Sequence, residues 1–240
     1  MVRNSIITGS SRGIGRAIAI KLAEQSENVL INYRGNAEAA DETAQMVREK
    51  GAEPIVIQAN VRDEADCKKL AASFDCVDIL VHNAAIGVLK PYQNIRRNQW
   101  DLTLESSLRP MWMLTKMCNM RDGGNVIGIS STGSRGFIPG YAAMGAAKAG
   151  LEALTRQLAV EMSPQKVRVN TVCGGLIQTD TLQYFPETMQ PLIEHAATYT
   201  PLGRIGLPED MANAVWLLTQ KEAFWITGQT IIVDGGLSLL

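Results

Sequence analysis

The stretch Thr8-Gly9-Ser10-Ser11-Arg12-Gly13-Ile14-Gly15 decides the fold. It follows an apolar run over residues 2–8 and opens a segment, residues 13–25, in which apolar residues recur every four positions. Glycines let a backbone turn sharply and approach a ligand closely. The N–H groups and dipole at the start of a helix also attract phosphate. A glycine-rich turn between a strand and a helix predicts a dinucleotide site, in preference to a tight turn that binds nothing.

Short apolar strands alternate with helical segments along the rest of the chain. Strands are expected at residues 2–8, 28–32, 54–59, 77–82, 125–130, 167–172 and 229–233. Helices are expected at residues 13–25, 37–50, 64–74, 141–162 and 208–219, with two more within 94–120. This alternation predicts an α/β fold, a doubly wound parallel seven-stranded sheet (Rossmann fold) forming a single domain over residues 1–240.

One stretch, residues 178–201, shows no regular pattern and contains Pro186 and Pro191. It is longer than an ordinary connection in such a sheet, which indicates an inserted loop that covers a substrate, in preference to a disordered segment. Its apolar residues suit an acyl chain, but they equally suit packing of the loop on its own protein; they are Leu182, Tyr184, Phe185, Met189, Leu192 and Ile193.

Composition and charge exclude several classes of protein. Of the 240 residues, 46% are hydrophobic and 20% are charged, which excludes a disordered chain. The net charge of −1 lacks the basic excess of a nucleic-acid-binding protein. Four cysteines without CxxC spacing and two distant histidines favour neither a disulfide framework nor a metal site. No stretch is apolar enough to span a bilayer, so we expect a cytoplasmic protein with no membrane partner.

Further motifs follow the glycine turn in a fixed order. They are His82-Asn83-Ala84-Ala85, Ile129-Ser130-Ser131, Tyr141 with Lys148, the run from Gly174 to Thr179, and the run from Gly228 to Gly236. Together with the Gly-x3-Gly-x-Gly spacing, they resemble the short-chain dehydrogenase/reductase family over essentially the whole chain. The resemblance implies a nicotinamide dinucleotide bound by Gly9, Ser11, Arg12, Gly13, Ile14, Gly15, Arg34, Asn60, Val61, Asn83, Ala84, Lys148, Gly175, Ile177 and Thr179.

The end of the second expected strand favours one cofactor. It reads Asn32-Tyr33-Arg34, without the acidic residue that would bind the ribose 2′-hydroxyl of NAD. Arg12 and Arg34 could instead flank a 2′-phosphate, although the same residues would also serve as solvated surface arginines. We therefore predict NADPH. Asn60-Val61 stands where the family has Asp-Val beside the adenine.

The expected proton donor departs from the family pattern. The family places a tyrosine four residues before the lysine, but Met144 occupies that position here and cannot donate a proton. The nearest tyrosine is Tyr141, seven residues before Lys148, which ideal helix geometry brings back to nearly the same face. The resemblance implies that Tyr141 is the acid, that Lys148 lowers its pKa and holds the ribose, and that Ser131 assists. Ser107 replaces an asparagine of the family's ketoreductases.

The displaced tyrosine indicates a particular reaction. In reduction of an enoyl thioester, charge develops on the thioester oxygen, several bonds from the carbon that receives hydride, so the donor must stand farther from the nicotinamide. Tyr-x6-Lys resembles the enoyl-ACP reductases, and segments 83–91, 151–156 and 174–186 resemble their branch III. We expect NADPH-dependent reduction of an enoyl group on acyl carrier protein or CoA, in fatty-acid synthesis. The alternatives are a 3-oxoacyl-ACP or other short-chain carbonyl reductase, and a non-catalytic NADP-binding protein.

The chain ends in the apolar run Gly236-Leu237-Ser238-Leu239-Leu240. An exposed apolar segment usually marks an interface. Since the family is commonly tetrameric, we expect a homotetramer.

Overall fold

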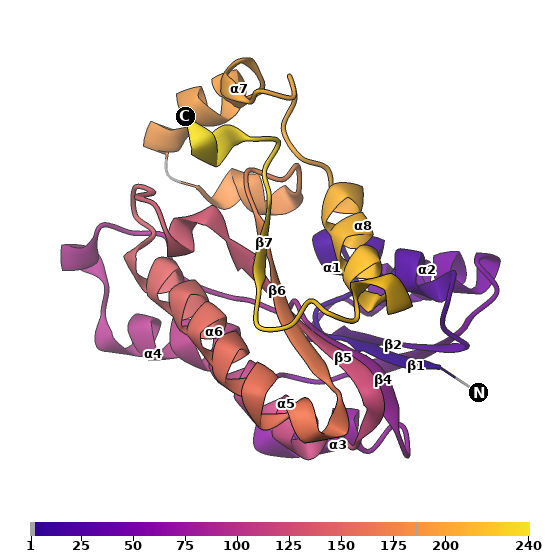
Figure 1. Ribbon diagram of the computed structural model, residues 1–240. Helices are drawn as coiled ribbons and strands as arrows, with labels where there is room; N and C mark the ends of the chain where they lie inside the picture. The colour runs from indigo at the N-terminus through magenta and orange to yellow at the C-terminus, as the bar shows by residue number, and fades with distance from the viewer. Residues whose placement is uncertain (1–2, 186) are drawn as a thin grey trace.

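A computed structural model describes residues 3–185 and 187–240 and contains, within them, one seven-stranded sheet (Figure 1). The strand order is β3-β2-β1-β4-β5-β6-β7, and every neighbouring pair is parallel. The predicted doubly wound sheet is therefore confirmed. The strands are β1 Asn4–Ile7, β2 Asn28–Tyr33, β3 Glu53–Gln58, β4 Val77–His82, β5 Met120–Ser131, β6 Arg168–Gly174 and β7 Thr230–Val233.

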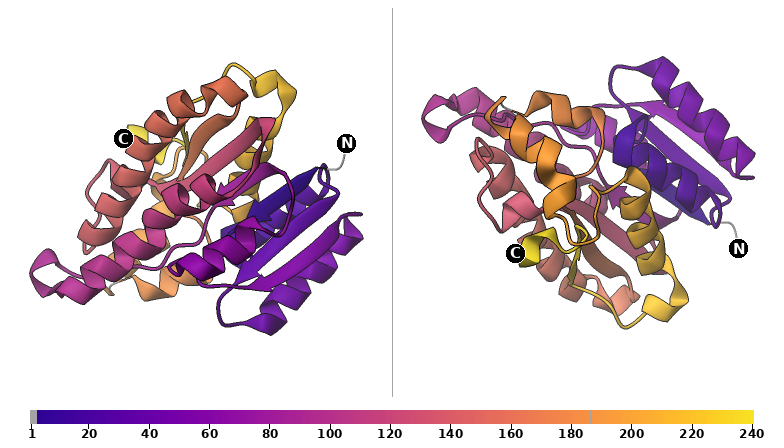
Figure 2. Two further views of the ribbon diagram at one scale, coloured as in Figure 1. Left: turned by 90° about the horizontal axis from the view of Figure 1, so that it is seen from below. Right: turned by 90° about the horizontal axis from the view of Figure 1, so that it is seen from above.

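Helices cover both faces of the sheet, as Figure 2 shows from two sides. One face carries α1 Gly13–Ala23, α2 Ala37–Glu49 and α8 Pro208–Thr219. The other carries α3 Glu64–Ala71, α5 Arg109–Met117 and α6 Ala142–Glu161, with α4 Arg97–Ser107 packed on α6. Each face has its own hydrophobic core.

The central strands show why the sheet is buried on both sides. In β1, Ile6 belongs to the core under α3 and α5, and its neighbour Ile7 belongs to the core under α1 and α8. Leu80 and Val81 of β4 divide between the two cores in the same way. Side chains of a strand alternate between faces, so continuous apolar runs are what a sheet covered on both faces requires.

Some boundaries differ from the sequence-based expectation. The first strand covers Asn4–Ile7, and Val2 of the expected strand lies outside the described residues. The fifth strand begins at Met120, five residues early, because its first residues pair with β4 through a shift in register. The long helix starts after Tyr141, which is its N-cap residue.

The stretch at residues 178–201 is not irregular, which corrects the sequence-based interpretation. It contains the 3₁₀ turns η4 Asp180–Tyr184 and η5 Glu187–Met189 and the helix α7 Gln190–Tyr199. Pro191 lies in the first turn of α7, where a backbone N–H has no intrahelical partner and proline is tolerated. Met189 and Ala196 are buried. Pro186 and the side chains of Tyr184 and Leu192 lie outside what the structure describes.

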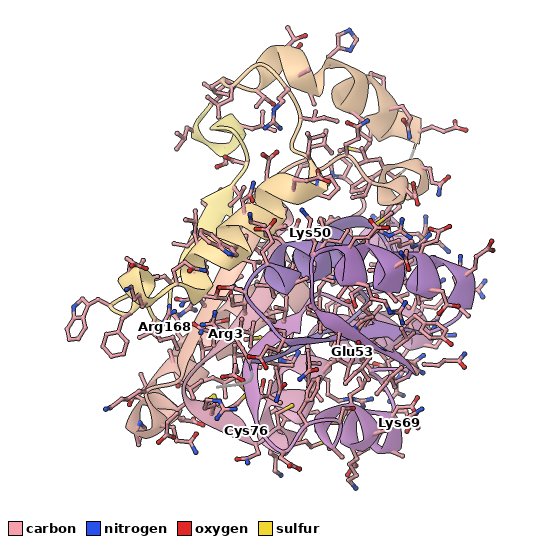
Figure 3. The ribbon with its side chains drawn as sticks, turned by 90° about the vertical axis from the view of Figure 1, so that its right-hand side faces the viewer. Arg3, Lys50, Glu53, Lys69, Cys76 and Arg168 are labelled. Atoms are coloured by element: carbon pink, nitrogen blue, oxygen red, sulfur yellow. The ribbon has the colours of Figure 1, made fainter. Side chains whose placement is uncertain are left out.

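The two ends of the sheet differ in character. At the carboxyl ends of the strands, the segment after α7 packs on the turn after β7, where the Leu202 N–H donates to the Gly235 carbonyl (Figures 1 and 2). At the opposite end, Figure 3 shows Arg168 near Arg3, and Arg168 donates to the carbonyl of Leu218 at the end of α8.

In the part of the chain that the structure describes, no helix is long and apolar enough to cross a membrane.

Candidate active site

The glycine-rich turn between β1 and α1 is held by two asparagines. The Gly9 N–H donates to Asn32 Oδ1 (3.0 Å), and Asn83 Nδ2 donates to the carbonyl oxygens of Gly9 (2.9 Å) and Thr8 (3.0 Å). A Cβ on Gly15 would overlap the Gly9 carbonyl oxygen and lie 2.5 Å from Asn83 Nδ2. The turn therefore requires glycine at position 15, and it brings the ends of β1, β2 and β4 together.

The start of α1 fits the phosphates of a dinucleotide. The first N–H groups of a helix have no intrahelical acceptor. Among the described residues, no side chain caps them, since the N-cap residue Arg12 makes no capping hydrogen bond. Gly13 has a φ of +56° and faces Thr179, so the turn after β6 lies across from this helix end. An anion held there would complete the hydrogen bonding of α1.

Three other predicted cofactor residues also shape the carboxyl edge of the sheet. The N–H of Ala84 donates to Thr8 Oγ1 (3.1 Å), which fixes the turn after β4. Gly175 stands so close to Asp234 that a Cβ on it would lie 2.5 Å from the Asp234 Cβ. Ile177 is buried in the core on the α1 side. These residues bring the turns after β1, β4, β6 and β7 to the same edge.

The residues expected around the adenosine part have partners of their own. Arg12 and Arg34 are exposed, and the Arg12 guanidinium lies 3.9 Å from the Asp180 carboxylate. Asn60 Oδ1 accepts from the Arg62 N–H (3.2 Å), so this side chain closes a turn after β3. Val61 is buried in the core on the α3 side. Both arginines face solvent and are accessible to an anionic group.

Sequence reasoning missed Arg16 of α1, whose side chain links the glycine-rich turn to α2. Arg16 Nη2 donates to the carbonyl oxygen of Ser11 (2.9 Å) and pairs with Glu42 of α2. Thr43 Oγ1 donates to the same Ser11 oxygen (3.0 Å). Ser11 is thus joined to α2 through its backbone.

A second group of residues lies at the end of β5. Tyr141, just before α6, donates its hydroxyl proton to Ser131 Oγ, the last residue of β5 (3.0 Å). The same oxygen accepts from the Gly133 N–H (3.2 Å). Lys148, two turns into the alanine-rich helix α6, donates from Nζ to the Ile129 carbonyl (2.7 Å). The structure therefore brings together the three residues that the sequence singled out for catalysis.

The electrostatics of this group differ from the expectation. Burial raises the pKa of the Tyr141 hydroxyl, and the hydrogen bond to Ser131 opposes that rise. The expected lowering of the Tyr141 pKa is not seen, because burial outweighs the other effects, and the Lys148 ammonium points to the Ile129 carbonyl. Loss of solvation lowers the pKa of Lys148 to about 8.

Met144 fills the position where the family has its tyrosine. It is 9% exposed, and Ser107 Oγ lies 3.8 Å from its sulfur. A Cβ on Gly87 would overlap this sulfur, so Met144 packs directly against the turn after β4. Ser107 also donates to the Ile86 carbonyl (3.2 Å). Met144 supplies packing and no proton.

A cavity of about 550 Å³ opens beside the Tyr141 ring. The ring of Phe185 stacks on Tyr141, with centroids 6.3 Å apart and planes 9° from parallel. Phe185 belongs to the stretch at 178–201, so this stretch reaches the site. The turns after β4 and β5 and the start of α6 line the cavity: Lys90, Pro91, Tyr92, Gly133, Gly136, Phe137, Ile138, Pro139, Gly140, Tyr141, Ala142, Gly145 and Ala146.

Two more polar residues escaped sequence reasoning. Asn32 is 2% exposed and bonds to the glycine turn and to the Ala59 carbonyl of the next chain segment (3.0 Å). Glu152, four residues after Lys148 on the buried face of α6, is 5% exposed. Two features of the sequence could have pointed to them: Asn32 is a polar residue in a mostly apolar strand, and Glu152 is an acidic residue on the same helical face as Lys148.

Comparison with known proteins identifies the family. The family model described as "Enoyl-(Acyl carrier protein) reductase" matches residues 9–238. The chain belongs to the short-chain dehydrogenase/reductase family. The predicted family is thus confirmed, and the protein is an oxidoreductase.

Individual relatives cover nearly the whole chain. The chain is 35% identical to 3-oxoacyl-(acyl-carrier-protein) reductase FabG of Staphylococcus aureus, over 99% of this chain and 98% of that protein. It is 36% identical to 1-cyclohexenylcarbonyl-CoA reductase of Streptomyces collinus, over 98% and 87%. The structure of angucycline C-6 ketoreductase LanV with bound NADP superimposes with a TM-score of 0.90 at 25% identity, covering 99% of this chain and 96% of that one.

Proposed function

We propose that the protein reduces an acyl group carried as a thioester on acyl carrier protein or CoA, in fatty-acid synthesis, with NADPH as the reductant. The position of Tyr141 carries the choice of a trans-2-enoyl group. Tyr141 lies seven residues before Lys148 and bonds to Ser131, and the packed thioether of Met144 fills the place four residues before Lys148. A donor set back in this way suits charge that develops on the distant thioester oxygen.

Each residue at the end of β5 would have a defined role. NADPH, when bound, supplies the hydride that adds to the β-carbon of the enoyl group. Burial raises the pKa of Tyr141, so its hydroxyl keeps its proton at neutral pH, and it turns from Ser131 to donate to the enolate oxygen when substrate binds. The enol formed there becomes the acyl thioester when its α-carbon takes a proton from solvent and its oxygen releases one. Ser131 Oγ still accepts from the Gly133 N–H, and its own proton is available to the same substrate oxygen. Lys148 holds the ribose hydroxyls from its buried position on α6.

A 3-oxoacyl substrate is the second candidate, and the named relatives favour it over the enoyl substrate. The Staphylococcus aureus relative is named for reduction of 3-oxoacyl groups on acyl carrier protein, and LanV is named a ketoreductase. The Streptomyces collinus relative points the other way, since a 1-cyclohexenylcarbonyl thioester is an α,β-unsaturated acyl group. The two substrates differ in where the proton must arrive.

A paired assay separates these candidates. The purified protein is given NADPH with crotonyl thioester or with acetoacetyl thioester, and oxidation of NADPH is followed by absorbance. Turnover of crotonyl thioester alone supports the enoyl assignment, and turnover of acetoacetyl thioester alone supports the second candidate. Tight NADPH binding without turnover of either would support the third interpretation, a non-catalytic NADP-binding protein.

The choice of NADPH rests on the charge around the end of β2. Arg12 and Arg34 are both exposed there, and β2 ends without an acidic residue. A 2′-phosphate between them would receive charge-assisted hydrogen bonds. Asp180, near Arg12, would then lose part of its pairing to that arginine.

The assembly we propose is a homotetramer, in the cytoplasm. β7 is the edge strand of the sheet, and its Ile231 and Ile232 are 37% and 41% exposed. Trp225, in the turn before β7, is 90% exposed, and the terminal Leu240 is 84% exposed. Apolar side chains along an open edge favour contact with further copies of the chain. A monomeric mass by light scattering at micromolar concentration would contradict the tetramer.

A further inference from the structure

A buried carboxylate lies directly behind the residues at the end of β5. Glu152 Oε1 accepts from the hydroxyls of Ser130 (2.7 Å) and Ser134 (2.5 Å), and its Oε2 accepts from Arg135 Nε (3.0 Å). The Glu152 side chain is 6% exposed, whereas that of Arg135 is 49% exposed. The carboxylate is therefore tied to three residues of one short segment, residues 130–135.

This segment contains Ser131 and is held on one side by Glu152 and on the other by the Tyr141 ring. On one side, Ser130 and Ser134 bond to Glu152. On the other side, the Tyr141 ring packs so closely that a Cβ on Gly133 would lie 2.5 Å from the ring. The segment thus has little freedom to move without displacing either the carboxylate or the tyrosine ring.

Helix α6 and the residue that caps it contact three successive residues of β5. Lys148 bonds to the Ile129 carbonyl, Glu152 to Ser130, and Tyr141 to Ser131. Lys148 and Glu152 are four residues apart, so they lie on the same helical face, toward the strand. The sequence places the carboxylate one turn beyond the lysine, where it meets the serine hydroxyl.

A buried carboxylate is a costly way to fill space. Removing a charge from water costs several kcal/mol, and well-packed apolar residues often stabilise a fold as well as or better than a buried ion pair. Stability alone therefore gives little reason for a glutamate here. What an apolar residue could not do is fix two hydroxyl groups on either side of Ser131.

We propose that Glu152 is a positioning residue for reduction, which acts by fixing the segment 130–135 so that Ser131 and Tyr141 keep their hydroxyl geometry. The inference rests on the proposed function, because it takes these two hydroxyls as the groups that meet the substrate. Glu152 itself touches neither substrate nor cofactor in this assignment. Its effect is transmitted through Ser130 and Ser134.

The hydrogen-bond pattern predicts how substitutions differ. Both serine hydroxyls bond to the same oxygen, Oε1, and only Arg135 uses the other. Glu152→Gln keeps a carbonyl oxygen for the two serines, whereas Glu152→Ala removes both acceptor atoms. Ser134→Ala releases the far end of the segment and leaves Glu152 paired to Ser130 and Arg135. Glu161→Ala, at the exposed end of the same helix, is the matched control.

The experiment measures kcat on whichever thioester the wild type reduces, NADPH affinity by fluorescence, and hydrogen–deuterium exchange of residues 130–136 without substrate. Because misplacement of a group by about 1 Å can cost ~100-fold, we expect kcat to fall about 10- to 100-fold in Glu152→Ala. We expect a fall of about 3- to 10-fold in Ser134→Ala, and a change below about threefold in Glu152→Gln and Glu161→Ala. NADPH affinity should stay within about threefold of the wild type in all four.

The same measurements separate this proposal from a purely structural role and from an error in the proposed function. Faster exchange of residues 130–136 in Ser134→Ala, with a lower kcat and unchanged NADPH affinity, supports the proposal. Unchanged kcat and exchange in Ser134→Ala overturn it, even if Glu152→Ala fails to fold. If the wild type reduces neither thioester, the proposed function fails, while the exchange measurement still tests whether Glu152 fixes the segment.

Discussion

Replacement of Tyr141 by phenylalanine is the most informative perturbation of the site. The change keeps the ring, and therefore its packing on Gly133 and its stacking with Phe185. It removes one hydroxyl, whose partner is Ser131 Oγ at 3.0 Å. Ser131 still accepts from the Gly133 N–H, so no buried acceptor is left without a donor.

The structure separates the expected effect on folding from the effect on catalysis. Loss of one hydrogen bond with its acceptor otherwise satisfied should lower the free energy of unfolding by about 0.5–1.5 kcal/mol. Loss of a general acid should lower kcat by about 10²–10⁴-fold, which corresponds to about 2.7–5.4 kcal/mol in activation free energy. NADPH affinity should change little, because Tyr141 is not among the residues assigned to the dinucleotide.

Steady-state kinetics with crotonyl thioester and NADPH test this directly, with Met144→Ala as the control that removes packing but no proton donor. Adding Met144→Tyr to Tyr141→Phe should not restore enoyl reduction, since that hydroxyl would stand too near the nicotinamide. Weak reduction of acetoacetyl thioester by the double variant would fit the same geometry. Full activity in Tyr141→Phe would refute the reasoning, and Ser131 would become the next candidate donor.

Three further predictions concern other parts of the site. Burial lowers the pKa of Lys148 from 10.5 to about 8, so between these pH values the unfolded chain binds more protons than the folded one. The cofactor-free fold should therefore gain stability as the pH rises from 8 to 10. A wild-type melting temperature that falls relative to that of Lys148→Met between pH 7.5 and 9.5 would contradict this. Replacing Arg12 and Arg34 together by alanine should weaken NADPH binding by at least about tenfold more than NADH binding, and equal losses in a titration would rule out the 2′-phosphate assignment. Gly15→Ala should lower NADPH affinity by about 100-fold or more, because the new Cβ would overlap the Gly9 carbonyl oxygen. The control Gly35→Ala has open space around its Cβ and should bind NADPH as the wild type does.

Much of the fold follows from the sequence because it depends on local pattern. Apolar runs such as residues 77–82 predict strands buried on both faces, and glycines between a strand and a helix predict the turn at Gly9 to Gly15. Pro191 misled this reasoning. Read without its neighbours, it indicates an interruption, but in the structure it lies in the first turn of α7, where no hydrogen bond is lost.

The residues of the candidate site could be proposed from the sequence, whereas their electrostatics could not. The resemblance of the motifs to the family singled out Ser131, Tyr141 and Lys148. Only the tertiary structure decided that Lys148 points to a backbone carbonyl, and that burial shifts its pKa and that of Tyr141 in opposite directions. Desolvation depends on everything packed around a group, which includes residues far away in the chain. For the same reason the sequence shows a glutamate at position 152, but only the packing of α6 on β5 joins its carboxylate to the segment that carries Ser131.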